Sequence, residues 1–565
     1  MSESTPNQNQ PTLSPQELVA LVTTLQTEVL GLKTRMDEGE VQNDSLRETI
    51  VNLTHENELL KRRLYGNKTE RTNTSELQLT LGELLKDEKQ LQKELDAAVA
   101  TAQNEGDGNE APSKPKHKPK GRRDLSVSNL PKVLIEIKDE ELEKTGKRIG
   151  FEESRELMFR RGGWSVLVKR VAKYAVDGPY GSSVVGVPVP KQLFRRGLLH
   201  TSAVAHLITK KFSLGVPHYR LEQHLNDQSV ELDRGTMCRY VEEAGGALGA
   251  TIVQAMWDDA LQSAAVISTD ATGALIQPEK TSKGGHQACK KGHFFTAVVD
   301  ADAVLFAYAE KHTQAFVKGL FGTFKGYLQS DASNVYDILD RGPPKDTDEG
   351  VTLVGCWAHC RRYFFEAAVC RYAVGVQGLM RIRALYVADE AFRKLAPAER
   401  QRLRQEHLRP LMADFFEWVE TAQSTAQGRN LATKALGYAK NQKLELLRVL
   451  DDRRLPLDNT RSERSLRKIV VGRKAWMFYG SDTHAQSAAA IFSIVASCRL
   501  HKLDPEQYLD EIFRVLPFWP QNRYLELAPK HWATTRSRLN PDELDSPIAG
   551  FTIPEAQPAS ALSAP

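Results

Sequence analysis

Two aspartates in separate parts of the sequence carry the side chains that a hard divalent cation needs. Asp270 ends the apolar stretch SAAVISTD, and Asp331 ends FKGYLQSD. Each is expected to close a strand, and two such strands side by side would let the carboxylates converge. Mg²⁺ takes several carboxylate oxygens at one place and keeps its other positions for water and phosphate. A single Asp at a strand end is more often a turn or cap residue, so the prediction depends on the pair.

A third carboxylate is expected from the segment LPLDNTRSERSLRKIVVGRKAWMFYGS. Helical spacing places Asn459, Glu463 and Arg467 on one face, so Glu463 can point towards the metals. The positions around this face are strongly basic: Arg464, Lys468, Arg473 and Lys474. A carboxylate among so many cations suits a site that holds metals beside a polyanion. The alternative is a surface helix whose Glu–Arg pairs each contribute only a few tenths of a kcal/mol.

The elements between these residues predict one α/β core. The strand with Asp270 is followed by GHFFTAVVDADAVLFAYA, which predicts two antiparallel strands joined at 300–302. A helix around 314–322, the strand with Asp331 and a further helix complete an order expected of a ribonuclease-H-like fold. We therefore predict that 258–366 and 451–516 form the core. The stretch 367–450, rich in Arg and Glu, is expected to be a helical insertion between its two parts.

The segment GCWAHCRRYF follows the second Asp and contains Cys356 and His359. A Cys-x-x-His-Cys pattern invites a metal interpretation, but the position in a strand-to-helix segment favours support of the active site or of the substrate. Trp357 has the ring to stack on a base, although a core Trp is the simpler alternative. Arg361 and Arg362 are candidate phosphate contacts.

The N-terminal region has a heptad pattern. Leucines at positions 18, 25, 32, 46, 53 and 60 lie in a seven-residue series that only Gly39 interrupts, and Asn43 and Asn57 occupy a positions. A seam of this length predicts a parallel homodimeric coiled coil over 15–66, with the asparagines setting its register. The alternative is a long helix packed inside its own domain, but no apolar partner face lies nearby in the sequence. A second helical segment is expected over 67–103.

Several segments suggest nucleic-acid binding. The stretch 104–123 reads as a flexible basic linker whose Lys116, Lys118 and Lys120 could neutralise phosphates, the alternative being a merely solvated linker. A small β-containing module is expected over 124–190. Helical spacing over 191–250 predicts a helix-turn-helix region, whose last helix is N-capped by Asp233 and presents Arg234 and Arg239 to DNA. Helix pairs of this kind are also common in proteins that bind no DNA.

The length, charge, hydrophobicity and cysteine content of the chain limit its possible class. The 565 residues fit three to four domains, and the net charge is only +4. The sequence has no apolar run long enough to cross a membrane and no apolar leader segment, so a cytoplasmic protein without a membrane partner is expected. Six scattered cysteines form no Cys-x-x-Cys pair, which argues against a disulfide framework. The tail 517–565 is expected to be irregular or disordered.

The ordered motifs resemble a known family. The pieces STDAT, YLQSDASNVYD, CWAHCRRYFFE, LDNTRSERSLRKIVVGRKAWMFYGS and LDPEQYLDEIF are similar to transposases of the insertion-sequence family sixty-six, as are LLKRRLYGNKTER and GVPHYRLEQHL. The resemblance implies an Asp-Asp-Glu triad of Asp270, Asp331 and Glu463. It also implies two Mg²⁺ ions per site, replaceable by Mn²⁺, and strand cleavage and transfer at the terminal repeats of a bacterial mobile element. Expected partners are element and target DNA in the nucleoid, further copies of the chain, and small accessory proteins.

The sequence departs from that family between the zipper and the helix-turn-helix. Family members carry two Cys-x-x-Cys pairs there, whereas the corresponding stretches here are ELEKTGKRIG and KYAVDGPYG, without cysteine. A structural zinc site needs four ligands of that soft type, so none is expected.

Three other functions stay open from the sequence. The first is a dimeric DNA-binding regulator without catalysis, which would not need three carboxylates in their motifs. A ribonuclease-H-like nuclease that cuts without joining would use the same site. A coiled-coil scaffold with an inactive enzyme domain is the third alternative, and the intact triad argues against it.

Overall fold

A computed structural model describes residues 130–160, 162–178, 181–194, 197–278, 288–300, 302–339, 350–393, 395–548 and 550–558. The predicted coiled coil, the segment 67–103 and the basic linker with its lysines lie outside these residues. The described chain is mixed α/β and divides into two compact units. One unit holds 361–383 and 417–438, and the other holds the rest. No helix in the described part is long and apolar enough to cross a membrane.

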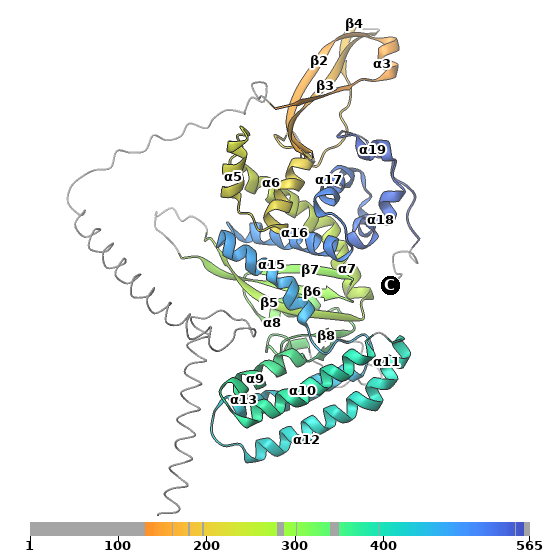
Figure 1. The fold of residues 1–565 in the computed structure, drawn as a ribbon. Helices are drawn as coiled ribbons and strands as arrows, with labels where there is room; N and C mark the ends of the chain where they lie inside the picture. Colours follow the sequence, from red (N-terminus) through yellow and green to blue (C-terminus); the bar gives the residue numbers. More distant parts are fainter. Residues whose placement is uncertain are drawn as a thin grey trace, which may run out of the picture. The chain divides into compact units, whose positions relative to one another are not determined.

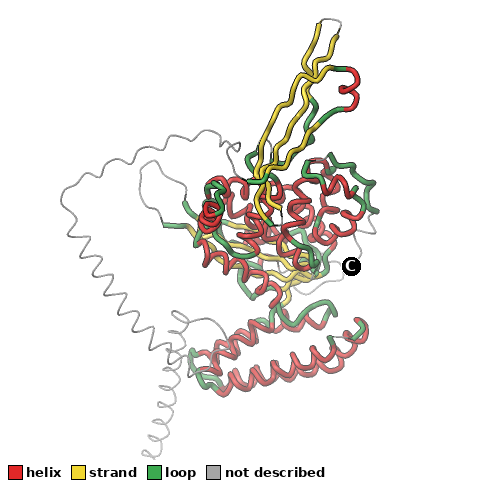
Figure 2. The backbone as a smooth tube through the Cα atoms, turned by 45° about the horizontal axis from the view of Figure 1, so that its top comes forward, coloured by secondary structure: helices red, strands yellow, loops and turns green. Residues whose placement is uncertain are grey.

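The β-containing module is an elongated ribbon of strands (Figures 1 and 2). Strand β3 is its central strand, pairing antiparallel with β2 and β4 and parallel with β1. Its elements are β1 (Lys132–Ile137), α3 (Glu140–Thr145), β2 (Lys147–Arg160), β3 (Gly163–Gly178) and β4 (Gly181–Gly186). These strands agree with the β structure expected within 124–190. Side chains such as Leu157 and Val166 are buried, and β2 bonds to the chain before α4 at Leu199.

Helices follow the ribbon: α4 (Thr201–Ile208), η2 (Thr209–Ser213), α5 (His218–Asp227), α6 (Arg234–Leu248), η3 (Gly249–Val253) and α7 (Gln254–Ser263). Asp233 is the N-cap of α6, as predicted, because its carboxylate accepts a 2.8 Å hydrogen bond from the Thr236 amide. The helix runs to Leu248. The apolar residues on its inner side, Met237, Val241 and Leu248, are buried.

The central sheet has the strand order β7-β6-β5-β8-β9. Its strands are β5 (Val266–Ile276), β6 (Lys290–Val299), β7 (Ala303–Ala309), β8 (Tyr327–Gln329) and β9 (Thr352–Val354). Pairing is antiparallel between β5, β6 and β7 and parallel between β5, β8 and β9. The predicted hairpin at 300–302 is confirmed, as is the helix α8 (Gln314–Phe321).

Two expectations about this sheet are wrong. Strand β5 does not end at Asp270 but continues to Ile276, because these later residues keep pairing with β6 after the pairing with β8 has stopped at Ser268. No α-helix follows Asp331 directly in the described residues. A single 3₁₀ turn, η4 (Asp337–Leu339), follows it instead, because Tyr336 is buried and its backbone N–H closes a turn on the Ser333 carbonyl.

Two helices from the C-terminal part of the core cover the sheet: α15 (Thr460–Trp476) and α16 (Asp482–Leu500). Helix α16 lies on the edge strand β7, as Figure 1 shows. The N–H groups of Val304 and Phe306 on that strand donate to the hydroxyls of Ser497 and Ser493. An unpaired strand edge invites association with another chain, and these serines satisfy part of the β7 edge.

The stretch predicted as a helical insertion is helical, which confirms that expectation at the level of secondary structure. Its elements are α9 (Trp357–Val369), α10 (Ala373–Phe392), α11 (Pro397–Leu403), η5 (Arg404–Leu408), α12 (Arg409–Thr425), α13 (Leu431–Asn441), α14 (Lys443–Leu447) and η6 (Arg448–Leu450). Trp357 is fully buried, packs against Phe415 and donates to the Leu446 carbonyl. It is therefore a core residue and cannot stack on a base.

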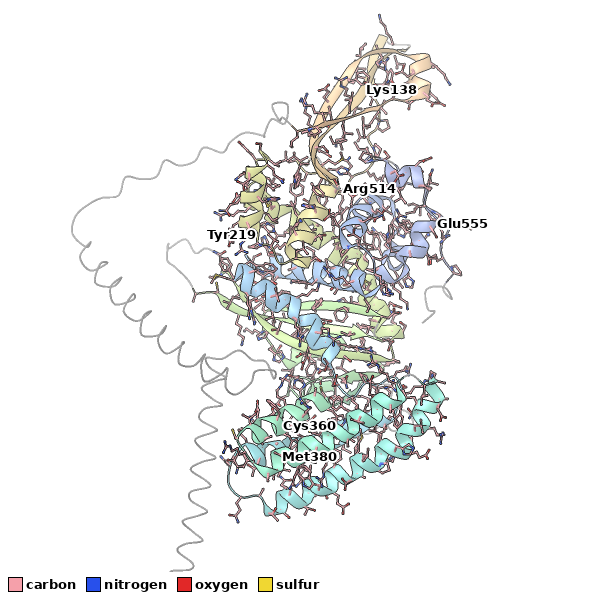
Figure 3. The ribbon with its side chains drawn as sticks, viewed as in Figure 1. Lys138, Tyr219, Cys360, Met380, Arg514 and Glu555 are labelled. Atoms are coloured by element: carbon pink, nitrogen blue, oxygen red, sulfur yellow. The ribbon has the colours of Figure 1, made fainter. Side chains whose placement is uncertain are left out.

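The expectation of an irregular or disordered tail is wrong for 517–558. Helix α17 (Pro505–Val515) is followed by η7 (Leu516–Phe518), η8 (Gln521–Leu527), α18 (Pro529–Ser537) and α19 (Pro541–Asp545). Trp532 and Phe551 are buried. Arg514 on α17 (Figure 3) donates to the carbonyls of Leu544 and Ser546. The tail was expected to lack order because Pro and Ala are frequent in it, but Trp519, Leu527 and Leu544 are also buried.

Candidate active site

The register of β5 and β8 places the two aspartates at equivalent positions. Ser268 pairs with Gln329 in the parallel ladder, and Asp270 and Asp331 each lie two residues further along. Asp270 lies within β5, where side chains alternate between faces with a period of two, so it is on the same face as Ser268. Asp331 follows the end of β8 by two residues. The Ser330 N–H donates to the Val354 carbonyl and extends the pairing beyond β8. The expected proximity of the two strands is thus present, although β5 continues past its Asp.

Tyr336 is a buried residue that contacts β5 at Thr269, next to Asp270. Its phenol oxygen is 3.4 Å from the Thr269 hydroxyl oxygen. Burial is the main cause of the raised pKa of Tyr336; the contact with Thr269 opposes it, and the charges of Asp331 and Asp270 raise it further.

The N-terminal end of α15 is bound directly to β5. The Asn459 side-chain amide donates to the Thr269 carbonyl at 3.3 Å, and the Ser462 hydroxyl donates to the Ser268 carbonyl at 2.8 Å. These bonds hold the helix start beside the strand that carries Asp270, and Glu463 is the next residue of α15. An open groove of about 320 Å³ contains both carboxylates. Its lining residues are Asp270, Ala271, Thr272, Glu463, Leu466, Arg467, Val470 and Val471.

Cys356 and His359 contact the same helix start. The Nε2 atom of His359 lies 3.7 Å from Oε1 of Glu463, and Cys356 Sγ donates to Oδ1 of Asn459 at 3.0 Å. Burial raises the pKa of Cys356 to about 12, so it remains a protonated donor and not a thiolate ligand. Cys356 and His359 therefore support the start of α15 and the Glu463 side chain.

Carboxylate oxygens are the type of ligand that a hard cation takes. The three carboxylates form two pairs, and Asp270 belongs to both. Asp270 and Asp331 are related by the register of β5 and β8, while Asp270 and Glu463 line the same groove. Within the described ranges, no group of three or more His, Cys, Asp and Glu side chains is arranged to hold a metal ion. The fit therefore rests on the chemistry of the donors and on the two pairs.

The predicted phosphate contacts lie in different environments. Arg464, Arg467 and Lys474 are exposed, and none of them has an ion-pair partner in the part of the chain that the structure describes. Arg473 donates to the Gly273 carbonyl and so also fastens α15 to β5.

The other predicted arginines belong to α6 and α9. Arg234 is exposed, with its Nε 3.8 Å from Glu222, and Arg239 donates to the Thr236 hydroxyl at 2.8 Å. Arg361 and Arg362 belong to the smaller unit.

Sequence reasoning did not single out three polar residues of the site: Tyr336, Ser462 and Gln329. The Gln329 amide donates to the Pro456 carbonyl at 2.9 Å and its oxygen accepts from Ser268, so it joins β8 to the segment before α15. Two of the three lie inside the motif YLQSDASNVYD. Gln329 could have been found from the sequence because it is a polar residue within an apolar strand, and a buried polar group needs a hydrogen-bond partner.

Comparison with known proteins gives consistent matches along the chain. A family model described as "Transposase IS66 family" matches residues 196–487. Models described as "Transposase C of IS166 homeodomain" and "IS66 C-terminal element" match 52–135 and 493–530. The uncharacterized protein y4qI of Sinorhizobium fredii is 26% identical over 500 residues, covering 86% of this chain and 89% of that protein. A second uncharacterized protein of that organism, y4hP, is 25% identical over 367 residues, covering 61% of this chain and 64% of that protein.

Proposed function

The chain belongs to the IS66 transposase family, and from that premise we propose that it cuts DNA at the ends of an insertion sequence and joins them to target DNA. The observation that carries this proposal is the position of Asp270 and Asp331, each two residues beyond the last paired residues of the adjacent parallel strands β5 and β8, with Glu463 in the groove beside Asp270. The strand order β7-β6-β5-β8-β9 supports a ribonuclease-H-like core. The fold alone would not imply this activity, so the proposal rests on the carboxylates.

In this proposal Asp270 and Asp331 hold Mg²⁺, and Glu463 completes the ligand set; Mn²⁺ could replace it. Two such ions, when bound, would supply activation of water or of a DNA 3′-hydroxyl and stabilisation of the leaving oxygen in an in-line displacement at phosphorus. The protein's own part is positioning. His359 lies against Glu463 and orients its carboxylate, while the Cys356–Asn459 contact fixes the helix start from which Glu463 projects.

Charge neutralisation along the DNA backbone is the second contribution of the chain. Arg464 and Arg467 flank Glu463 on α15 without ion-pair partners among the described residues, and they would hold phosphates next to the carboxylates. Recognition of the element ends by 191–250, the basic linker and the coiled-coil dimer belongs to the same proposal. Cleavage by this site needs no covalent protein–DNA bond.

The decisive experiment is a cleavage and strand-transfer assay. Purified full-length protein is mixed with a labelled duplex that carries the element's terminal repeat, in Mg²⁺ or Ca²⁺. Wild type is compared with Asp270→Asn, Glu463→Gln and, as a control, Glu310→Gln, an exposed carboxylate at the end of β7. We expect Mg²⁺-dependent nicking and joined products, reduced by a factor on the order of 100 to 1,000 in the two site variants but not in the control.

Each other outcome has a defined meaning. Equal cutting by wild type and Glu463→Gln would overturn the assignment of that residue. Binding of the repeat by wild type without any cutting would favour the DNA-binding regulator. Nicking without joined products would favour a nuclease.

A further inference from the structure

One face of α15 is a continuous cationic surface. Its exposed positions recur every three or four residues, which is the spacing of a single helix face. They are Arg461, Arg464, Arg467, Val471 and Lys474. None of the four cations has an ion-pair partner in the described part of the chain. Unneutralised cations in a row are complementary to the phosphates of a nucleic acid strand.

The turn that ends this helix has a strained backbone. Met477 has φ 65° and ψ −48°, and the Phe478 N–H donates to the Trp476 carbonyl at 2.8 Å. Together these describe a three-residue γ-turn of the rare, strained form. The two side chains that it displays are large and apolar, and Met477 and Phe478 are 68% and 43% exposed. Strain at an exposed apolar turn suggests a binding role, since neither feature contributes to the stability of the core.

The residues on either side of the turn are firmly packed. Lys211 Nζ lies 5.3 Å from the centre of the Trp476 ring. Tyr479 is buried, its N–H donates to the Leu275 carbonyl, and its carbonyl accepts from the Gln277 N–H. The turn is therefore held to β5 on one side and to the core on the other, so Met477 and Phe478 project from a rigid base.

We propose that Met477 and Phe478 form an apolar wedge that inserts between base pairs of a DNA duplex lying along α15. This inference rests on the proposed function, because it takes the DNA to be held at the carboxylates. Fourteen residues separate Glu463 from Met477, which corresponds to about 21 Å of helix. At about 3.4 Å per base pair, the wedge reaches a step about six base pairs from the phosphate at the carboxylates. Apolar side chains inserted in this way unstack a base step and kink the duplex.

The wedge is tested by placing 2-aminopurine at successive positions of the terminal-repeat duplex and measuring its fluorescence with full-length protein. We expect about a threefold rise at one step roughly four to eight base pairs from the scissile phosphate, where the base is unstacked. Met477→Gly combined with Phe478→Ser should abolish the rise, and Gly suits the left-handed backbone at 477. The matched control is Leu444→Ser, whose side chain is 64% exposed. The conservative variant Phe478→Tyr should keep the rise.

Three results would overturn the wedge: no rise at any position, a rise confined to the base pairs flanking the scissile phosphate, or a rise that persists in the double variant. A change of oligomeric mass in the double variant without DNA would assign the turn to contact between copies and would also overturn it. Failure of the proposed function looks different. Protein that shows the rise but never cuts supports the wedge and contradicts catalysis, whereas protein that cuts without the rise contradicts the wedge alone.

Discussion

The thiol of Cys356 donates a 3.0 Å hydrogen bond to the side-chain oxygen of Asn459, a residue 103 positions later in the chain. The Asn459 backbone N–H donates back to the same sulfur at 3.4 Å, and its side-chain amide donates to the Thr269 carbonyl. All these groups are buried. Asn459 therefore joins the strand of the first aspartate, the segment after the second aspartate and the helix of the glutamate.

Replacing Asn459 with Ala should weaken both the fold and the site. It leaves the Cys356 thiol and the Thr269 carbonyl without their partner, and an unsatisfied buried polar group costs about 1–3 kcal/mol. We expect the free energy of unfolding to fall by that amount in urea titrations and strand cleavage to fall with it. Cys356→Ser, which keeps a hydroxyl donor, should lose less than Cys356→Ala. An Asn459→Ala protein as stable and as active as wild type would contradict this role.

The cations of α15 should determine how strongly DNA binding depends on salt. Each phosphate contact releases a counterion, so Arg464→Ala and Arg467→Ala should each reduce the slope of log affinity against log salt by about 1. Fluorescence anisotropy with the terminal-repeat duplex at several salt concentrations measures this slope. Arg402→Ala is the control, because Arg402 is paired with Glu399 and Glu406. Unchanged slopes in both α15 variants would remove this helix from the DNA interface.

The close approach of α6 and α16 should make Gly245 intolerant of substitution. A Cβ atom at Gly245 would lie 2.5 Å from both Cβ and the carbonyl oxygen of Ser487, whereas one at Gly246 would meet open space. Gly245→Ala should therefore destabilise the protein by about 1–3 kcal/mol through overpacking. Gly246→Ala should be neutral, or stabilise by up to about 1 kcal/mol through helix propensity. Thermal unfolding of the two variants measures the difference in their stability. Equal melting temperatures would show that α6 and α16 can move apart without loss of stability.

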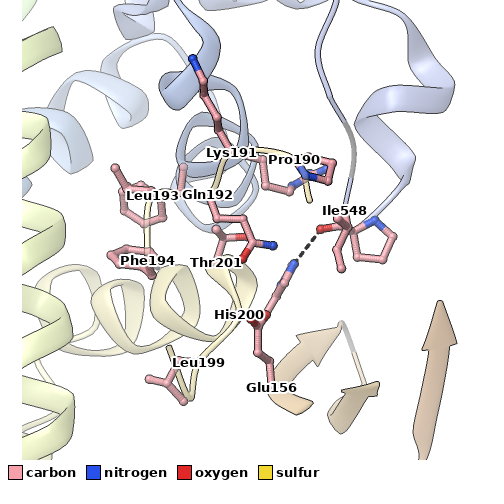
Figure 4. Close-up of a pocket in the computed structure, with 13 residues that line it drawn as sticks. Glu156, Pro190, Lys191, Gln192, Leu193, Phe194, Leu199, His200, Thr201 and Ile548 are labelled. Carbon is pink, nitrogen blue, oxygen red and sulfur yellow. Dashed lines mark hydrogen bonds between the residues drawn. The ribbon is translucent and has the colours of Figure 1, made fainter. Parts of the chain in front are cut away.

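Burial of His200 should make stability depend on pH below neutrality. His200 lines a cavity of about 30 Å³ (Figure 4), and its Nε2 lies 3.0 Å from the Pro547 carbonyl oxygen. Burial lowers its pKa below the ordinary 6.5, and the opposing effects of Asp510, Pro547 and Glu156 do not cancel this. The folded state therefore resists protonation while the unfolded chain accepts it. The corresponding stability is present above pH 6.5 and is lost as the pH falls below that value.

The measurement for His200 is the urea midpoint between neutral and mildly acidic pH. His200→Gln should show a shallower loss with falling pH, by up to about 1.4 kcal/mol per pH unit, whereas substitution of the exposed His224 should leave the wild-type slope. If the urea midpoint of His200→Gln fell with pH as steeply as that of wild type, the His200 imidazole would have the same pKa in the folded and the unfolded state.

Local patterns in the sequence determined several elements directly. The hairpin at 300–302, the helix that carries Glu463 and the N-cap at Asp233 were predicted correctly, because capping, turns and helical periodicity depend on residues close together in the chain. The motifs with Asp270, Asp331 and Glu463 could also be named before any contact was known. Their catalytic roles remain a proposal for the strand-transfer assay.

Only the tertiary structure decided how these residues are supported. Asp270 lies within β5 because β6 continues to pair beyond it, and Asn459 meets Cys356 because two distant segments pack together. The order of 517–558 and the exposed turn at Met477 also depend on surfaces supplied by other parts of the chain. Burial is a property of such long-range contacts, so no short stretch of sequence contains it.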